Sequence, residues 1–313
     1  MPDVVISEFM DEEAIREGLK GFDVVYDPKL VDKPDDLMRA LAEARAVIVR
    51  NRTQVRGALL DAAPKLKAVG RLGVGLDNID MEACKARGIA VYPATGANDV
   101  SVAEYVIGTA MMLLRGAYTA TGEVIAGAWP RNRLMGREIM GKRLGLVGFG
   151  NIAKETAKRA AALGMEVSAY DPYVLADSPV WRQPWGRVSP SSLDDIVAAS
   201  DVISLHVPLT SETRNLIDAG ALARMKRDAI VINAARGGVV DEAALADALK
   251  GGRLAGAALD VFDEEPLTAA KGAVFEGCPN LVLTPHIAGV AVESNVRVSW
   301  VTVENVRKHL AGV

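Results

Sequence analysis

The N-terminal part of the chain alternates short β-branched runs with segments whose apolar positions recur at helical spacing. The strand-like runs lie at 3–7, 22–26, 46–50 and 66–72, and the helical patterns between them lie at 11–20, 35–44 and 55–63. Such alternation is typical of a mainly parallel sheet with helices on both faces. The pattern therefore predicts an α/β lobe at the start of the chain.

A second set of strands follows a long helical pattern at 101–127. This pattern exceeds the usual length of a globular helix, and we expect it to bridge two lobes. Residues 143–172 then predict strand, turn, helix and strand, and apolar strands follow at 201–208, 229–235, 254–262 and 281–286. The closing helical pattern at 290–310 is expected to return to the first lobe.

Composition narrows the class of protein. A chain of 313 residues suits two domains better than one core. The net charge of −4 offers no field for a polyanion, so neither nucleic acid nor a membrane is an expected partner. Cys84 and Cys278 match no metal or redox spacing and suit a reducing compartment. The N-terminus shows no signal-like leader, so we expect a cytoplasmic protein. We also expect no metal, because the cysteines match no metal-binding spacing.

One glycine-rich turn points to a cofactor. "LVGFGNIA" places Gly148, Gly150 and Ala153 between a strand and the helix that Asn151 opens. In this context Gly148 permits the tight turn, Gly150 admits a pyrophosphate, and the helix N-terminus attracts phosphate. Asp171 ends the next strand, where it can accept from ribose hydroxyls and repel a 2′-phosphate. The pattern predicts NAD rather than NADP, and the alternative is a structural turn with a surface aspartate.

Three histidines are candidates for proton chemistry. His286 ends the strand in "LVLTPHIAG", where strand ends in open α/β sheets meet ligands, so it is the acid–base candidate. His206 lacks an acidic neighbour in the sequence and is expected to line the cofactor pocket, and His309 is expected to be solvated. An acid in "DVFDEEPL" could orient the imidazole, although a solvated acidic loop is the alternative. The acids of this segment are Asp260, Asp263, Glu264 and Glu265.

An arginine follows another strand, in "AIVINAARGG". The planar guanidinium of Arg236 matches a carboxylate in bidentate fashion, and Gly237 and Gly238 are expected to leave it unobstructed. A structural ion pair is the alternative.

Together these motifs resemble the D-isomer-specific 2-hydroxyacid dehydrogenases along essentially the whole chain. The resemblance is carried by "VGRLGVGLDNID", "GANDVSVAEYV", "GKRLGLVGFGNIA", "SLHVPLTSETRNLI", "INAARGGVVDEAAL", "GAALDVFDEEPL" and "LTPHIAG". It implies two doubly wound parallel-sheet domains: a flavodoxin-like substrate domain (1–97 plus 288–313) with an inserted Rossmann NAD domain (98–287). It also implies a homodimer built on the NAD domain.

The resemblance implies roles for matching residues. Arg236 is implied to bind the substrate carboxylate and carbonyl, His286 to be the general acid–base, and Glu265 to pair with it. The amides of Val74 and Gly75 are implied to hold the carboxylate. The expected cofactor-binding residues are Gly148, Gly150, Asn151, Ile152, Asp171, His206, Val207, Pro208, Ala234 and Asp260, the last at the nicotinamide amide. Two departures are mild: Ala153 replaces a third glycine, and Tyr105 stands where other members often carry histidine.

The substrate is less constrained than the reaction. Arg50, Arg52 and Arg56 crowd the end of a strand in the first lobe and would suit a second anion on C3 of the substrate. This favours 3-sulfolactate or 3-phosphoglycerate, and the chain ends without the regulatory extension of some phosphoglycerate dehydrogenases. If these arginines are solvated or paired, hydroxypyruvate or glyoxylate reduction is the alternative. A different class, NAD-sensing interaction proteins resembling carboxy-terminal-binding corepressors, adds flanking tails that this chain does not show.

Overall fold

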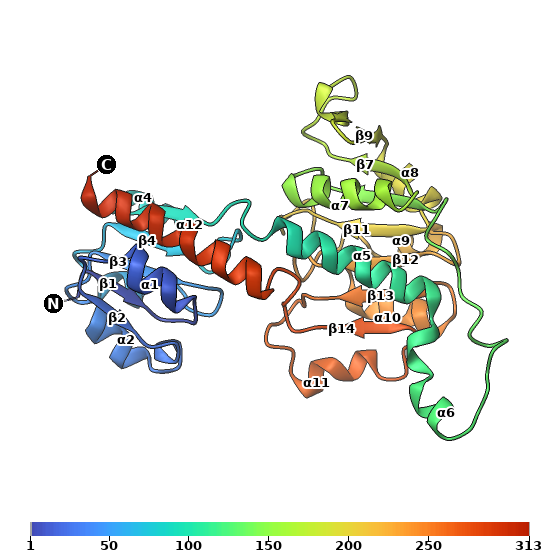
Figure 1. Ribbon diagram of the computed structural model, residues 1–313, viewed down its shortest axis with the longest axis horizontal. Helices are drawn as coiled ribbons and strands as arrows, with labels where there is room; N and C mark the ends of the chain where they lie inside the picture. Colours follow the sequence, from blue (N-terminus) through green and yellow to red (C-terminus); the bar gives the residue numbers. More distant parts are fainter. Residues whose placement is uncertain (1, 313) are drawn as a thin grey trace. The chain divides into compact units, whose positions relative to one another are not determined.

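The structure, a computed structural model, describes residues 2–312 and divides into two compact units. Unit 1 comprises Met1–Asn98 and Val290–Val313, and unit 2 comprises Asp99–Gly289. Each unit is a parallel sheet covered by helices, as Figure 1 shows. The boundaries expected from the sequence, after 97 and after 287, fall next to these.

Unit 1 contains a five-stranded parallel sheet in the order β2-β1-β3-β4-β5, which is the flavodoxin-like order. The strands are β1 (Val4–Ile6), β2 (Val24–Tyr26), β3 (Ala46–Val49), β4 (Ala68–Arg71) and β5 (Ala90–Pro93). β1 and β3 are buried throughout, because helices cover both faces of the sheet.

The helices of unit 1 place apolar side chains on both faces of this sheet. They are α1 (Glu12–Gly18), η1 (Leu30–Asp32), α2 (Pro34–Leu41), α3 (Ala58–Asp61), α4 (Met81–Ala86) and α12 (Val292–Ala311). The closing helix α12 packs on α1, β4 and β5, so it belongs to unit 1 as the sequence pattern predicts. Val298, Val303 and Val306 join Ile6 and Ile48 in one buried cluster.

Unit 2 contains a seven-stranded parallel sheet in the order β10-β7-β6-β11-β12-β13-β14. The strands are β6 (Arg143–Val147), β7 (Glu166–Tyr170), β10 (Ser189–Pro190), β11 (Val202–Leu205), β12 (Ile230–Asn233), β13 (Gly256–Leu259) and β14 (Leu281–Leu283). The order runs one way from β6 and then reverses at β11, which is the Rossmann arrangement. Ligands in such sheets bind at the carboxyl ends of the strands beside this reversal.

Helices cover both faces of the sheet in unit 2. α5 (Asp99–Arg115) and α7 (Asn151–Ala162) cover one face, and α8 (Leu193–Ala199), α9 (Ala219–Arg224) and α10 (Glu242–Lys250) cover the other. Shorter segments are α11 (Ala269–Gly272) and η4 (Ala273–Phe275). Within residues 2–312, no helix is both long and apolar enough to cross a membrane.

The long helix expected at 101–127 is interrupted. α5 ends at Arg115 because Gly116 adopts a left-handed conformation with φ of 61°, and two short segments follow, η2 (Ala117–Thr119) and α6 (Thr121–Ile125). α5 packs on α7, β12 and β13, so it is a core helix of unit 2 rather than the bridge that the pattern predicted.

The loop at 178–190, which carries Trp181 and Trp185, contains a small hairpin. It consists of η3 (Pro179–Trp181), β8 (Arg182–Gln183) and β9 (Gly186–Arg187). Trp181 is buried against the cofactor turn, with its ring centroid 4.8 Å from that of Phe149. The Trp181 indole N–H also donates to the Leu175 carbonyl at 2.8 Å. The hairpin therefore supports the glycine-rich turn, a role that the sequence did not reveal.

Candidate active site

Three chemically active side chains follow three adjacent strands of unit 2. Arg236 follows β12, Glu265 lies in the loop after β13, and His286 follows β14. Because the strands are parallel, their carboxyl ends share one edge of the sheet. The topology thus brings together residues that are up to 50 positions apart in the sequence.

His286 and Glu265 form a hydrogen-bonded pair. The imidazole Nδ1 lies 2.7 Å from Glu265 Oε2, and Glu265 Oε1 accepts from the Phe262 amide at 3.0 Å. Burial raises the pKa of Glu265, but the bonds from His286 and Phe262 and the charge of Arg236 outweigh it and lower that pKa. Glu265 is therefore an ionised acceptor that holds the proton on Nδ1 and leaves Nε2 for a substrate.

Arg236 lies near this pair, since its charge acts on Glu265. One guanidinium nitrogen donates to the Ala235 carbonyl at 2.6 Å. The following Gly237 has a role beyond leaving the arginine unobstructed: a Cβ there would lie 1.7 Å from the Phe262 carbonyl oxygen. Only glycine lets the Arg236 loop lie against the segment that carries Glu265.

Asp260 holds the backbone around His286. Its side chain is buried, and its two carboxylate oxygens accept from the amides of Ile287 and Ala288, each at 2.8 Å. The Asp260 carbonyl accepts from the His286 amide at 2.8 Å. His286 itself has φ of 57°, which is uncommon for a non-glycine residue and is maintained by these bonds. A contact between Asp260 and the nicotinamide stays a prediction.

The glycine-rich turn has the geometry that a dinucleotide requires. Gly148 has φ of 90°, and a Cβ there would lie 2.4 Å from the His206 carbonyl oxygen, so only glycine fits. A Cβ on Gly150, the N-cap of α7, would meet nothing within 4 Å. Open space at the N-terminus of a helix is what a pyrophosphate needs. Ala153 is fully buried beneath the turn.

Asp171 lies at the end of β7, beside this turn. Its carboxylate accepts from the Phe149 amide at 2.9 Å and from the Tyr173 amide at 3.0 Å. Each oxygen retains a further lone pair for a ribose hydroxyl. Asp171 thus links the glycine-rich turn to the end of β7. The preference for NAD is expected to depend on its carboxylate.

The other predicted cofactor residues lie at the same edge of the sheet. Asn151 and Ile152 begin α7, Val207 and Pro208 follow β11, and Ala234 follows β12. All of them are exposed or half-buried. Their cofactor contacts stay predictions, but their placement fits one continuous binding edge.

The two remaining histidines have structural partners. His206 Nε2 lies 2.9 Å from Ser204 Oγ, and burial lowers the pKa of His206 to about 4. His206 is therefore neutral near pH 7 and unsuited to be the acid. His309 is not simply solvated, because its Nδ1 lies 2.9 Å from the Tyr92 hydroxyl.

Unit 1 carries the predicted amide donors. Val74 and Gly75 lie in the glycine loop after β4, and within residues 2–312 no protein group accepts from the amide of either residue. Val74 is 37% exposed. Both amides are thus available to a ligand.

The arginines of unit 1 have protein partners. Arg50 is buried, lies over the Phe9 ring, and donates to the Phe9 carbonyl and to Asn295. Burial lowers the pKa of Arg50 to about 10. Arg52 is exposed and pairs with Asp32, and Arg56 donates to a backbone carbonyl. Arg50 therefore has a packing role, whereas Arg52 remains accessible.

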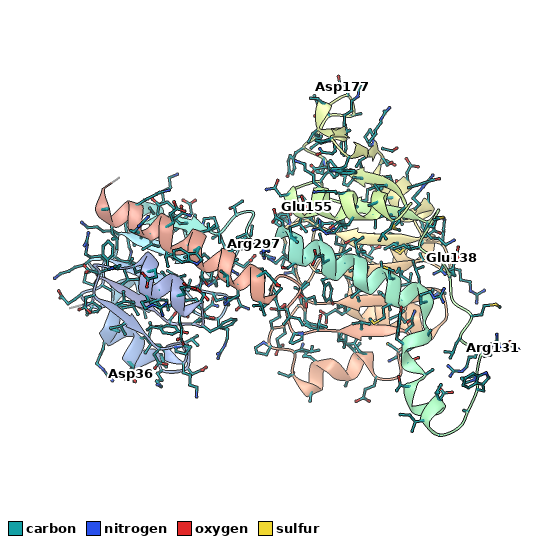
Figure 2. The ribbon with its side chains drawn as sticks, viewed as in Figure 1. Asp36, Arg131, Glu138, Glu155, Asp177 and Arg297 are labelled. Atoms are coloured by element: carbon teal, nitrogen blue, oxygen red, sulfur yellow. The ribbon has the colours of Figure 1, made fainter. Side chains whose placement is uncertain are left out.

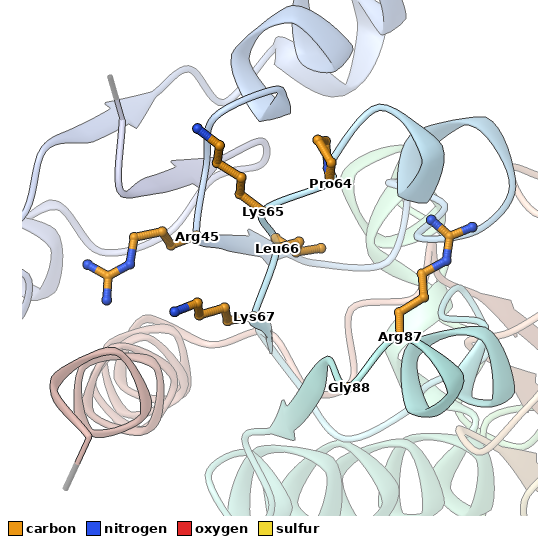
Figure 3. Close-up of a pocket in the computed structure, with 7 residues that line it drawn as sticks. All are labelled: Arg45, Pro64, Lys65, Leu66, Lys67, Arg87 and Gly88. Carbon is orange, nitrogen blue, oxygen red and sulfur yellow. The ribbon is translucent and has the colours of Figure 1, made fainter.

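Unit 1 also has a shallow basic depression, shown in Figure 3. Its cations are Arg45, Lys65, Lys67 and Arg87, with Pro64, Leu66 and Gly88 between them. Three of these cations form ion pairs, with Asp3, Glu43 and Asp61 respectively. The depression therefore has little uncompensated charge with which to bind an anion.

The fold and the groups at this edge are those expected of a dehydrogenase: the glycine-rich turn lies at the same sheet edge as Arg236 and the hydrogen-bonded pair of His286 and Glu265. Residues 107–288 match the family model described as "D-isomer specific 2-hydroxyacid dehydrogenase, NAD binding domain". The chain belongs to the D-isomer-specific 2-hydroxyacid dehydrogenase family and is an NAD-dependent oxidoreductase.

Similar proteins agree with this family. The chain is 55% identical to an (S)-sulfolactate dehydrogenase of Chromohalobacter salexigens over 99% of both chains. It is 45% identical to a D-3-phosphoglycerate dehydrogenase of Mycobacterium bovis over 90% of this chain and 52% of that protein, so it spans about half of that relative. A D-lactate dehydrogenase from Aquifex aeolicus, solved with NAD and lactic acid, superposes with a TM-score of 0.86 at 29% identity, covering 99% of this chain and 96% of that one.

Proposed function

We propose that this NAD-dependent 2-hydroxyacid dehydrogenase interconverts (S)-3-sulfolactate and 3-sulfopyruvate. The observation that carries the proposal is the similarity to an (S)-sulfolactate dehydrogenase along essentially the full length of both chains. The phosphoglycerate dehydrogenase relative, by contrast, is matched over only about half of its length.

The stereochemical label of this substrate agrees with a D-specific family. In sulfolactate the CH₂ group that bears sulfur outranks the carboxylate, whereas in phosphoglycerate the carboxylate outranks the CH₂ group that bears oxygen. The same spatial arrangement at C2 is therefore named S in sulfolactate and R, or D, in 3-phosphoglycerate. An enzyme built for D-2-hydroxy acids presents the correct geometry to (S)-sulfolactate.

Proton transfer is assigned to His286. In oxidation, its Nε2 takes the proton of the C2 hydroxyl, and ionised Glu265 at Nδ1 stabilises the resulting imidazolium. In reduction, protonated His286 returns that proton, and Arg236 polarises the carbonyl as charge develops on oxygen. NAD, when bound, supplies or takes up the hydride.

The second anion is assigned to Arg52. Its pairing with Asp32 is exposed, and such pairs are worth about 0–1 kcal/mol, so a sulfonate can compete for the guanidinium. Arg50 supports the same strand end but is committed to Phe9 and Asn295. The amides of Val74 and Gly75 are assigned to the substrate carboxylate.

A homodimer in the cytoplasm completes the proposal. The segment from α6 to β6 exposes large apolar side chains, which a second copy would cover. They are Ile125, Trp129, Met135 and Met140, between 70% and 85% exposed. The two unpaired cysteines are compatible with a reducing compartment.

The substrate is tested with a panel of 2-oxo acids and NADH. We expect the highest kcat/KM with 3-sulfopyruvate, ahead of 3-phosphohydroxypyruvate, hydroxypyruvate and glyoxylate. Arg52→Ala removes a charge-assisted contact, so kcat/KM should fall about 10- to 150-fold on the anionic acids and little on glyoxylate. Arg39→Ala, which removes a more exposed arginine that is also paired with an acid, Asp36, is the control.

Other outcomes would redirect the proposal. Preference for 3-phosphohydroxypyruvate would make the enzyme a phosphoglycerate dehydrogenase. Equal losses on all acids, or none, would remove the second-anion site and favour hydroxypyruvate or glyoxylate reduction. No turnover with any acid, together with retained NADH binding, would favour an NAD sensor.

The acid–base role is tested separately with His286→Gln. This substitution keeps approximate size but removes the titrating group, so the rate should fall about 100- to 10,000-fold while NADH still binds. Turnover near that of the unsubstituted enzyme would assign proton transfer to another group.

A further inference from the structure

A partly buried series of hydrogen-bonded hydroxyl groups leads from helix α5 to the turn that carries His286. The Tyr105 hydroxyl lies 2.7 Å from Thr284 Oγ1, and Thr284 Oγ1 donates to Asp260 Oδ1 at 2.6 Å. Tyr105 is half-buried on α5, and Thr284 directly follows β14. All three residues belong to unit 2.

The direction of the hydrogen bonds in this chain is fixed. A threonine hydroxyl has one proton, and that proton is committed to the Asp260 carboxylate. The Tyr105 hydroxyl must therefore donate to Thr284. Burial raises the pKa of Tyr105, and the charge of Asp260 adds to this against the lowering effect of the Thr284 bond, so the phenol keeps the proton that it donates.

This series of hydrogen bonds ends on the carboxylate of Asp260, which holds the backbone around His286 in place. With Thr284, Asp260 accepts three donors, and the other two are the amides of Ile287 and Ala288. These amides directly follow His286, whose own amide donates to the carbonyls of Asp260 and Thr284. The hydrogen bond that Tyr105 donates to Thr284 therefore acts on both sides of this turn. The central residue of the turn, His286, has a left-handed φ.

We propose that Tyr105 is a positioning residue for the acid–base pair, acting through Thr284 and Asp260 to hold the His286 ring against Glu265. The inference rests on the proposed role of His286. Tyr105 does not touch that ring: its effect passes through one hydroxyl and one carboxylate. Phenylalanine would fill the same space but leave the Thr284 hydroxyl without its donor.

The proposal is tested by a mutant cycle on the two hydroxyls. Tyr105→Phe should lower kcat for 2-oxo acid reduction about 2- to 10-fold, the effect of one neutral hydrogen bond. Thr284→Val should lower it about 10- to 150-fold because a donor to a carboxylate is lost. The double variant should match Thr284→Val alone. Thr284→Ser, which keeps the hydroxyl, should retain activity.

The control removes another hydroxyl from the same helix. Thr109 is buried on α5 and donates to the Tyr105 carbonyl, but it is not part of the hydroxyl chain. Thr109→Val should change kcat little. If Tyr105→Phe behaves like this control, or if its effect multiplies with that of Thr284→Val, Tyr105 does not act through Thr284.

A second readout does not depend on turnover. In ¹⁵N-histidine spectra of the protein without substrate, the Nδ1–H signal of His286, assigned with His286→Gln, should exchange with water faster in Tyr105→Phe and not in Thr109→Val. An unchanged exchange rate would overturn the positioning role. Faster exchange in a protein that turns over no 2-oxo acid would retain it and reject only the proposed function.

Discussion

At the scale of single residues, the site is built from groups that each serve two neighbours. Asp260 accepts backbone donors on both oxygens, and Glu265 accepts from a backbone amide as well as from His286. Asp171 likewise accepts two amides at the glycine-rich turn. Changes to such residues affect local backbone as well as ligand contacts, so a conservative change is needed to separate the two effects.

Asp171 offers one such test. Asp171→Asn keeps an oxygen for one backbone amide but removes the charge, so it should weaken NADH binding and reduce the exclusion of NADPH. The loss of a charge-assisted bond predicts a kcat/KM for NADH about 10- to 150-fold lower. Steady-state kinetics with both cofactors measures the change.

The matched control for Asp171 is Asp177→Asn. Asp177 is an exposed acid near the small hairpin, labelled in Figure 2, and its loss should leave both cofactors unaffected. Equal use of NADH and NADPH by the unsubstituted enzyme would show that Asp171 does not set the preference.

The residue-level features differ in how far the sequence predicts them. The Gly148 and Gly150 turn, Arg236, Glu265 and His286 are recognisable because their spacing from strands is regular. The chain from Tyr105 through Thr284 to Asp260 is not, because it joins α5 to a turn 179 positions later. The packing of α5 against β12 and β13 places Tyr105 within hydrogen-bond distance of Thr284.

At the scale of elements, strand ends are held together by acids outside the site. Asp201, just before β11, accepts from the amide of Arg143 at the start of β6 at 2.8 Å and from Lys226 at 3.0 Å. Burial raises the pKa of Asp201, but these two donors outweigh it and lower that pKa. The acid therefore joins two central strands at the edge opposite the cofactor turn.

This arrangement predicts a stability effect that depends on pH. A lowered carboxyl pKa stabilises the fold above the unfolded value, about 3.9, and this contribution is lost as pH falls through the folded value. Asp201→Asn should cost about 1–2 kcal/mol at pH 7 and less at pH 3, measured by urea denaturation. Asp194→Asn, which changes an exposed acid paired with Arg224, should cost little at either pH. An equal cost of Asp201→Asn at both pH values would mean that charge is not the cause.

Most elements follow from the sequence, and the exceptions have local causes. Most strands of both sheets lie within the predicted apolar runs, because strands covered on two faces need apolar side chains. The sequence pattern did not predict β5 and β10, which are short and not fully buried. The prediction of one helix at 101–127 is wrong beyond Arg115. The helical spacing of apolar residues continues past Gly116, but the backbone leaves the helical conformation there. The sequence does not reveal the role of the loop at 178–190, because the residue that it packs on, Phe149, lies in a motif that is complete without it.

At the scale of the whole molecule, the segment between α6 and β6 stands out because several large apolar side chains are exposed along it. Figure 1 shows that this segment runs from α6 to β6 as a long loop without a helix. Figure 2 labels Arg131 and Glu138 on it. Its exposed side chains include Trp129 and Met135, at 75% and 85%. Large apolar side chains grouped in this way are typical of an interface.

The proposed dimer can be tested on this segment. Replacing Trp129 and Met135 together by serine should shift the protein from dimer towards monomer, measured by sedimentation equilibrium at micromolar concentration. Arg131→Ser, a polar change in the same segment, should leave the dimer intact. A monomeric unsubstituted protein would contradict the assembly.

The division of the chain into two units has a consequence for how such enzymes diversify. Unit 2, Asp99–Gly289, contains His286, Glu265, Arg236 and the glycine-rich turn, whereas Arg52, which is proposed to bind the C3 group, lies in unit 1. If these assignments hold, a few substitutions in the smaller unit can change which 2-hydroxy acid is the substrate. The residues proposed for proton transfer and cofactor binding, which lie in the larger unit, can then stay the same.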